Sequence, residues 1–170
     1  HLTLTSEWSK YRWAPVNAEH TASLRDEEGY MWHESDQVEE HVDLDEVEGE
    51  IRAQIERCKR LGLTNPSHLD NHMGSLYGIE TGRFELLELT LSLAGEYGLP
   101  FRFPGSFTEA QFNNTMLDIN IDKSMIEMVF GKVVAFAKQQ GVAIPDYLMP
   151  NEWNEPQTQS YEQFRDYLYD

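Results

Sequence analysis

The feature that most constrains the fold is a unit that occurs three times: a helix with one apolar face, then a glycine, then a short apolar segment. Consecutive strands that are joined by helical crossovers run parallel in one sheet. A (β/α) barrel and a doubly wound sheet both satisfy this order. No G-x-G-x-x-G motif and no Walker-type lysine loop occurs, which favours the barrel. The helical stripes occupy residues 43–60, 83–97 and 123–140, and the strands that follow them are expected at 68–72, 99–104 and 142–147.

The ends of the helices carry recognisable signals. Asp43 is placed to cap the first helix, with Glu46 completing a capping box, and Asp122 is placed to cap the third. Ser160 opens a further capping box and a helix that continues toward the end of the sequence. The apolar stripes consist of Leu44, Val47, Ile51, Ile55 and Cys58 in the first helix, Phe84, Leu87, Leu91 and Ala94 in the second, and Met125, Val129, Val133 and Phe136 in the third.

Residues 65–74 concentrate the polar chemistry of the chain. An extended segment alternates its side chains, so His68, Asp70 and His72 leave the same face of this strand. Neutral imidazole binds zinc and other divalent ions, and a nearby carboxylate either binds the metal or orients a histidine. A metal site and a set of hydrogen-bonded structural residues are about equally good interpretations of this pattern.

The start of the chain adds a strand and an aromatic loop. Apolar and polar residues alternate at the outset, which puts His1 on the polar face of a strand. The aromatic loop, residues 6–15, carries Trp8, Tyr11 and Trp13. These rings are suited to stacking on the flat face of a ligand, and a lid that packs on its own scaffold explains them equally well.

Several other titratable residues are predicted individually. Arg102, at the end of the 99–104 strand, can hold a substrate oxygen, orient a carboxylate or form a surface ion pair. His20, His33 and His41 fall outside any clean periodicity and are expected to be exposed. Cys58 is the only cysteine, so no intrachain disulfide forms, and we expect a buried thiol.

Composition limits the class of protein. The 170 residues, with 40% hydrophobic and 25% charged side chains, suit one folded domain spanning residues 1–170. The net charge of -17 disfavours nucleic acid and anionic membranes as partners. A reducing cytoplasm is expected, with no transmembrane span or signal peptide. Because the first residue already lies in a strand pattern and the last helix stops in mid-pattern, the domain is expected to be cut at both ends.

Five segments in order resemble the YdjC-like carbohydrate deacetylases, which include the chitooligosaccharide deacetylase. The opening H-L-T-L-T and the H-x-D-x-H strand are the most specific parts of this resemblance. It implies a distorted (β/α) barrel of the polysaccharide-deacetylase type, present here as a partial chain, with Mg²⁺ or Zn²⁺ as cofactor. The implied reaction removes an N-acetyl group from an amino sugar or short oligosaccharide. The segments are HLTLTSEW (1–8), YRW (11–13), EIRAQIER (50–57), SHLDNHMG (67–74) and LPFRFP (99–104).

The resemblance also assigns roles to individual residues. It implies that His1 and His72 bind the metal, and that the family's Asp-Asp motif and a later histidine lie outside this sequence. Residues 1–170 alone are therefore expected to be inactive, with Asp70 as the candidate base within them. Arg102, Trp8 and Trp13 are the candidate substrate-binding residues.

Other functions stay open at this point. A carbohydrate-binding barrel without chemistry would use the aromatic loop alone, and another metal-dependent sugar-processing barrel, such as an isomerase, would need more carboxylate ligands. The expected partner is an acetylated amino sugar or oligosaccharide, and a homodimer is compatible with the sequence.

Overall fold

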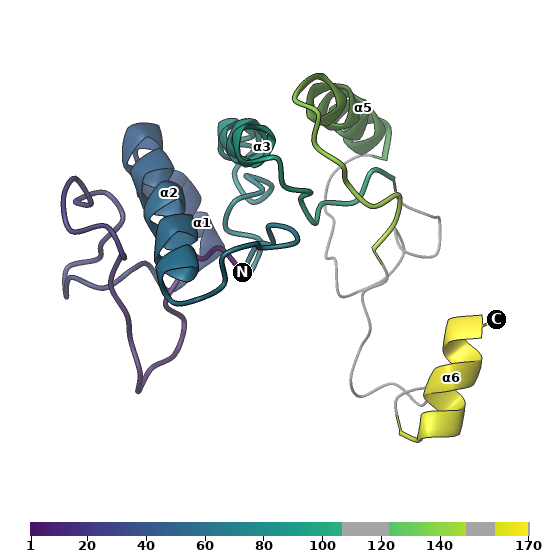
Figure 1. The fold of residues 1–170 in the computed structure, drawn as a ribbon, viewed down its shortest axis with the longest axis horizontal. Coiled ribbons are helices and arrows are strands. Elements are labelled where there is room, and N and C mark those ends of the chain that lie inside the picture. Colours follow the sequence, from purple (N-terminus) through teal and green to yellow (C-terminus); the bar gives the residue numbers. More distant parts are fainter. Residues whose placement is uncertain (107–122, 149–158, 170) are drawn as a thin grey trace.

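The computed structural model describes residues 1–106, 123–148 and 159–169. The described residues form the helices α1 (Ser35–His41), α2 (Leu44–Arg60), α3 (Glu85–Tyr97), α5 (Lys123–Gln139) and α6 (Tyr161–Tyr169). Figure 1 shows α2, α3 and α5 in this order across the molecule, and α3 contacts both of its neighbours. Along the chain, α2, α3 and α5 lie between the short segments that pair with one another, and α6 lies near the C-terminus.

The predicted ends of α2 are largely confirmed. Asp43 caps the helix, because its Oδ1 accepts hydrogen bonds from the backbone N–H of Asp45 (2.9 Å) and Glu46 (3.3 Å). The predicted capping box is wrong, since the Glu46 carboxylate accepts instead from the N–H (2.7 Å) and hydroxyl (2.6 Å) of Ser23. Glu46 therefore ties the preceding loop to α2 rather than closing the helix on itself.

The other helices follow their predicted stripes with shifted boundaries. α3 starts at Glu85 and ends at Tyr97, and Gly98 caps it with a φ of 65°, the left-handed conformation that glycine adopts readily. α6 begins as predicted, with the Ser160 hydroxyl accepting from the N–H of Gln163 at 3.2 Å. The predicted cap at Asp122 and the side chain of Met125 lie outside the described residues.

Helix α1 was not predicted from the sequence. It is only seven residues long, so its apolar period is too short to detect. Its N-terminus is closed by a reciprocal capping box between Glu34 and Gln37.

The predicted strands are present as a set of parallel bridges. Leu2 pairs with Asn71 and Leu69 pairs with Phe101, both in parallel, and the N–H of Phe101 donates to the carbonyl of Ala143 at 3.0 Å. Helices α2, α3 and α5 connect these segments in turn, which confirms parallel segments joined by helical crossovers.

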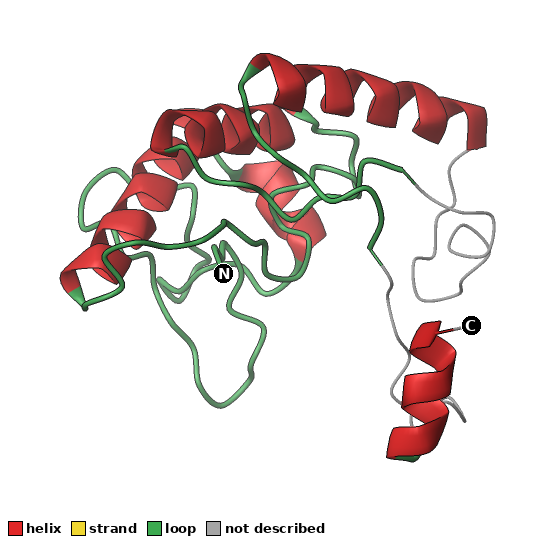
Figure 2. Cartoon of the chain, turned by 45° about the vertical axis from the view of Figure 1, so that its right-hand side comes forward, coloured by secondary structure: helices red, strands yellow, loops and turns green. Residues whose placement is uncertain are grey.

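The expectation of continuous strands at 1–5, 68–72, 99–104 and 142–147 is wrong for the described residues. Figure 2 accordingly shows red helices joined by green loops. Pro100 and Pro104 supply no N–H to a ladder. Met73 (φ 54°) and Gly74 (φ 74°) turn the chain directly after the bridge at Asn71.

The core lies between the helices and the bridged segments. α2 buries Val47, Ile51 and Ile55, and α3 buries Leu87, Leu91 and Ala94 of its predicted stripe. Cys58, predicted to be buried, is only half-buried at the end of α2. The buried apolar residues include Leu2, Leu4, Leu24, Met31, Val38, Leu69, Leu76, Leu86, Phe101, Phe103, Phe130 and Val133.

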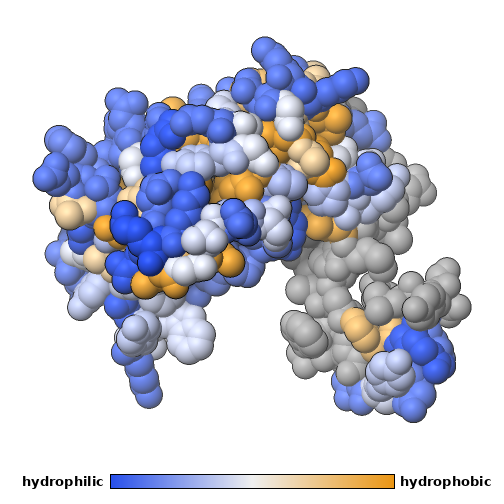
Figure 3. Space-filling model, in the orientation of Figure 1, coloured by the Kyte–Doolittle hydropathy of each residue, from blue (hydrophilic) through white to orange (hydrophobic). Residues whose placement is uncertain are grey.

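The surface agrees with the acidic composition. The face drawn in Figure 3 is mostly hydrophilic, with hydrophobic residues showing in smaller patches between the helices. In the part of the chain that the structure describes, no helix has the length and apolar character needed to cross a membrane.

Candidate functional site

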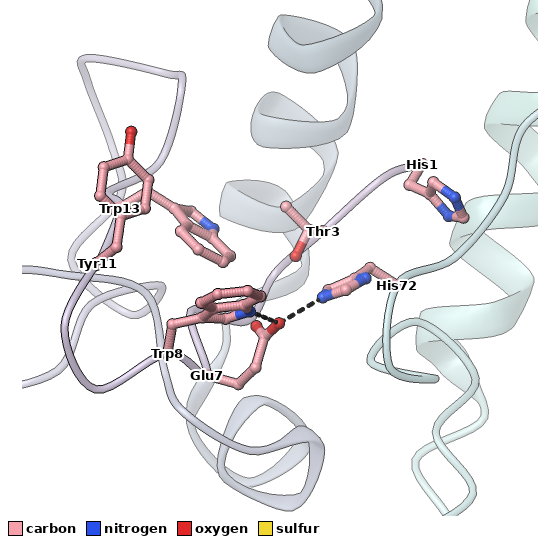
Figure 4. A pocket seen from close by; sticks show the side chains of 7 residues that line it. All are labelled: His1, Thr3, Glu7, Trp8, Tyr11, Trp13 and His72. Carbon is pink, nitrogen blue, oxygen red and sulfur yellow. Dashed lines mark hydrogen bonds and ion pairs between the residues drawn. The ribbon is translucent and has the colours of Figure 1, made fainter. Parts of the chain in front are cut away.

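Parallel pairing of two segments brings His1 and His72 together. The N–H of Leu2 donates to the carbonyl of Asp70 (2.7 Å), and the N–H of His72 donates to the carbonyl of Leu2 (2.9 Å). The two imidazole rings consequently lie with their centroids 6.3 Å apart and their planes at 76°. Figure 4 shows both side chains at one end of the same pocket. Their role as metal ligands stays a prediction.

A carboxylate holds each of these rings. Nδ1 of His1 lies 2.8 Å from Oδ2 of Asp70, and the other oxygen of Asp70 pairs with Nε of Arg102. Nε2 of His72 lies 2.9 Å from Oε1 of Glu7. Each imidazole thus has one nitrogen bonded to a carboxylate while the other nitrogen has no protein partner among the described residues. This is the arrangement that orients a metal-binding histidine and fixes its tautomer.

Glu7 is a site residue that the sequence analysis missed. Its Oε1 also accepts a hydrogen bond from Nε1 of Trp8 at 2.9 Å. Burial raises the pKa of Glu7, but its backbone hydrogen bond and the bond to His72 outweigh burial and hold that pKa below its ordinary value. Glu7 is therefore ionised at neutral pH. Its partner is 65 residues away in the sequence, so no local signal pointed to it.

The pocket has a volume of about 430 Å³ and joins the histidines to the aromatic loop. Trp8 and Tyr11 are 63% and 73% exposed, whereas Trp13 is half-buried and packs against the core. Oε2 of Glu7 and Nε1 of Trp13 are buried without a hydrogen-bond partner. The residues that line it are His1, Thr3, Glu7, Trp8, Tyr11, Trp13 and His72 (Figure 4).

The aromatic loop is fastened at both ends. The N–H of Ser6 donates to the carbonyl of Trp32 at 2.7 Å, and the Ser6 hydroxyl accepts from the N–H of Trp13 at 2.9 Å. The Trp13 carbonyl accepts in turn from the N–H of Met31 at 3.0 Å. Trp13 packs on the scaffold, as the lid interpretation predicts, while Trp8 and Tyr11 are exposed, and their stacking on a ligand stays a prediction.

Two of the predicted histidine positions differ in the structure. His68 does not join the site: it is exposed, and its Nδ1 lies 2.8 Å from the hydroxyl of Ser67. Alternation fails there because the paired backbone begins only at Leu69. His33 is half-buried rather than exposed, whereas His20 and His41 are exposed as predicted.

Arg102 contacts Asp70 and is absent from the pocket lining. Its side chain is 45% exposed, so the contact fits two of the three predicted roles, an ion pair at the surface and the orientation of a carboxylate. Its place in substrate binding stays a prediction.

The described residues fit part of a metal site. His1 and His72 each offer a free imidazole nitrogen, but within the described ranges no group of three or more His, Cys, Asp or Glu side chains is placed to hold one ion. A catalytic zinc site uses three protein ligands. At least one ligand besides the two histidines is therefore needed to complete the site.

Comparison with known proteins identifies relatives of this chain. A curated carbohydrate deacetylase from Enterococcus faecalis is 33% identical over 137 residues, which is 79% of this chain and 48% of that protein. A curated carbohydrate deacetylase from Thermus thermophilus is 38% identical over 99 residues, 58% of this chain and 34% of that protein. The chain thus spans half or less of the length of the curated relatives it matches.

A solved structure shares the fold. It comes from Enterococcus faecalis and is provisionally described as a cellobiose-phosphate cleavage protein. It superimposes with a TM-score of 0.64 at 29% identity, over 99% of this chain and 52% of that one.

The model of one protein family, described as YdjC-like protein, matches residues 1–170. Because the match extends over the whole chain, it includes the paired segments that carry His1 and His72. The chain belongs to the YdjC-like family.

Proposed function

We propose that the protein is a metal-dependent carbohydrate deacetylase that hydrolyses the N-acetyl group of an amino sugar or short oligosaccharide. The observation that carries the proposal is the meeting of His1 and His72, each held by a carboxylate, beside an aromatic pocket. Curated relatives named carbohydrate deacetylase support the same activity. We further propose that the parallel segments belong to a distorted (β/α) barrel whose ligand-binding end is this pocket.

The proposed metal ligands are His1, through Nε2, and His72, through Nδ1, with at least one further ligand. A bound Mg²⁺ or Zn²⁺ would supply positive charge that polarises an acetamide carbonyl and makes a water more acidic. Asp70 and Glu7 each hold one ring through one of its nitrogens, Nδ1 of His1 and Nε2 of His72, which leaves the other nitrogen of each ring free. The aromatic loop presents the exposed ring of Trp8 to a sugar face, next to the histidines.

Asp70 is better suited to orient His1 than to act as a base. Both of its oxygens are engaged, one by His1 and the other by Arg102 and the N–H of Asn71. A base must have a free oxygen within reach of the proton that it removes. We therefore assign Asp70 and Arg102 to positioning and leave the base to a residue elsewhere in the protein.

The test is to replace His72 by alanine in the whole protein and to measure acetate release from N-acetylated chitooligosaccharides with added Mg²⁺ or Zn²⁺. We expect activity to fall at least about a thousand-fold, because loss of a ligand removes several kcal/mol of transition-state stabilisation. His68→Ala is the matched control, since His68 is exposed four residues away and outside the pocket.

Two outcomes would contradict the proposal. Full activity and full metal content in purified His72→Ala protein would exclude His72 as a ligand. Sugar binding without acetate release by the unmodified protein would instead favour a carbohydrate-binding role.

A further inference from the structure

One oxygen of Glu7 connects two parts of the pocket that differ in their proposed roles. Oε1 lies 2.9 Å from Nε2 of His72 and accepts a hydrogen bond from Nε1 of Trp8, also at 2.9 Å. Figure 4 shows these two bonds converging on the same oxygen. The carboxylate therefore lies between the histidine end of the pocket and its aromatic wall.

The bond to Trp8 restrains a side chain that would otherwise be free. The Trp8 ring is 63% exposed, and an exposed ring on a loop gains little orientation from packing. A hydrogen bond from the indole N–H to an ionised acceptor is stronger than a neutral one and fixes the direction of the ring edge. The direction of the Trp8 indole N–H is thus set by Glu7 rather than by the core.

The backbone on the N-terminal side of Glu7 is itself fixed. Ser6 is fully buried and is bonded to both Trp32 and Trp13. Glu7 consequently extends from a fixed backbone, and its side chain restrains the rings of His72 and Trp8 that contact it. Its second oxygen is buried with no protein partner, a costly state that folding alone does not explain.

We propose that Glu7 is a positioning residue with two simultaneous effects. It holds the proton of His72 on Nε2, which leaves Nδ1 free for a cation, and it holds the Trp8 indole at a set distance from that nitrogen for stacking on the sugar. This inference rests on the proposed deacetylase function in one respect only, which is that the ligand stacked on Trp8 is a sugar. The effect on His72 is a property of the protein without metal or substrate.

The first measurement needs no variant. The ¹⁵N chemical shifts of the ring nitrogens of His72 in the metal-free protein report its tautomer, with the signals assigned by through-bond correlation to the backbone of His72. We expect the proton on Nε2. A proton on Nδ1 would overturn the proposal even if every variant failed to fold.

The second measurement separates the two effects in the whole protein. Glu7→Gln removes the charge with little change in size, so we expect His72 to populate both tautomers and Zn²⁺ affinity, measured by calorimetry, to fall 10–100-fold. Trp8→Phe keeps a ring but removes the N–H, so we expect normal Zn²⁺ affinity and a several-fold higher KM with nearly unchanged kcat. The control is Glu27→Gln, which removes an exposed carboxylate that does not line the pocket.

The double variant tests whether the two effects meet at Glu7. If Glu7 sets the ring of Trp8, Glu7→Gln already releases it, and adding Trp8→Phe should raise KM by less than it does alone. The proposal would be overturned if Trp8→Phe raised KM by the same factor in Glu7→Gln as in the unmodified protein. It would also be overturned if Glu7→Gln left the tautomer of His72 and the Zn²⁺ affinity unchanged. Failure of the unmodified protein to release acetate would instead contradict the proposed function, because the tautomer and Zn²⁺ measurements do not depend on activity.

Discussion

Arg12 is a buried cation that fastens the aromatic loop to the turn at residues 26–29. Its side chain is 9% exposed, and its Nη2 donates to Oδ2 of Asp26 at 2.7 Å and to the carbonyl of Met31 at 2.5 Å. Burial raises the pKa of Asp26, but hydrogen bonds from Arg12 and from the backbone outweigh it and hold that pKa below its ordinary value. Asp26 therefore contributes stability as an anion.

We predict that Asp26→Asn lowers the free energy of unfolding by about 2 kcal/mol at pH 7, because it leaves the mostly buried Arg12 with only the longer contact to the Glu28 carboxylate, at 3.4 Å. A carboxyl group whose folded-state pKa is depressed stabilises the protein above its unfolded-state pKa of about 3.9. That stability is lost as the pH falls through the folded-state pKa. Urea unfolding at pH 7, 5, 4 and 3 should therefore show the two proteins converging in acid. A constant difference across this range would show that the charge of Asp26 is not the cause, and Glu27→Gln is the control.

The site could be predicted from the sequence only where local pattern defines it. His1 lies in the H-L-T-L-T motif and His72 in the H-x-D-x-H motif. The alternation of side chains along a strand put Asp70 on the same face as His72. Glu7 and Arg12 act through partners that are far away in sequence, so nothing in their surroundings marks them. Alternation also misled at His68, because the alternating pattern starts in the sequence before the paired backbone begins at Leu69.

At the scale of elements, Gly95 lies where α3 meets the end of α5. A Cβ at Gly95 would lie 2.5 Å from the main-chain oxygen of Gln140. Gly131, within α5, has open space around the same position. Comparing alanine substitutions at these two glycines therefore distinguishes the effect of helix propensity from the effect of packing.

We predict that Gly95→Ala destabilises the protein by about 1–3 kcal/mol, because backbone at Gln140 cannot yield as a flexible side chain would. The gain of up to about 1 kcal/mol from replacing glycine in a helix should not compensate. Gly131→Ala is the matched variant, and we expect it to be neutral or stabilising. Thermal unfolding of both variants is the measurement, and a stabilised Gly95→Ala would mean that α3 and α5 are not held this closely.

Helices could be predicted better than strands for a physical reason. A stripe such as Val47, Ile51 and Ile55 repeats over several turns, and Asp43 marks its start. α1, with seven residues, is too short for such a repeat. The capping box at Glu46 failed because its carboxylate accepts hydrogen bonds from Ser23, a residue of the preceding loop, rather than from its own helix end. The predicted strand segments pair in parallel, as expected. Each pairing is a single bridge, because prolines and the turn at Met73 interrupt the segments.

At the scale of the whole molecule, charge opposes compaction. Thirty acidic residues face thirteen basic ones, and several cations are already paired, such as Arg12 with Asp26 and Arg52 with Glu48 and Glu96. Exposed ion pairs each contribute about 0–1 kcal/mol. The remaining carboxylates repel one another over distances comparable with the size of the molecule when salt is low.

We therefore predict that raising NaCl from about 10 to about 150 mM increases Tm by a few degrees, since the Debye length falls from about 30 to about 8 Å. Repulsion among unpaired carboxylates is screened over this range more than the short-range ion pairs are. Replacing the exposed Glu27, Glu40 and Glu127 together by glutamine should raise Tm at low salt and reduce the response to NaCl. Differential scanning calorimetry at fixed pH measures both effects. A fall in Tm with added salt would mean that attractive ion pairs, rather than the excess of carboxylates, dominate the electrostatic free energy of this molecule.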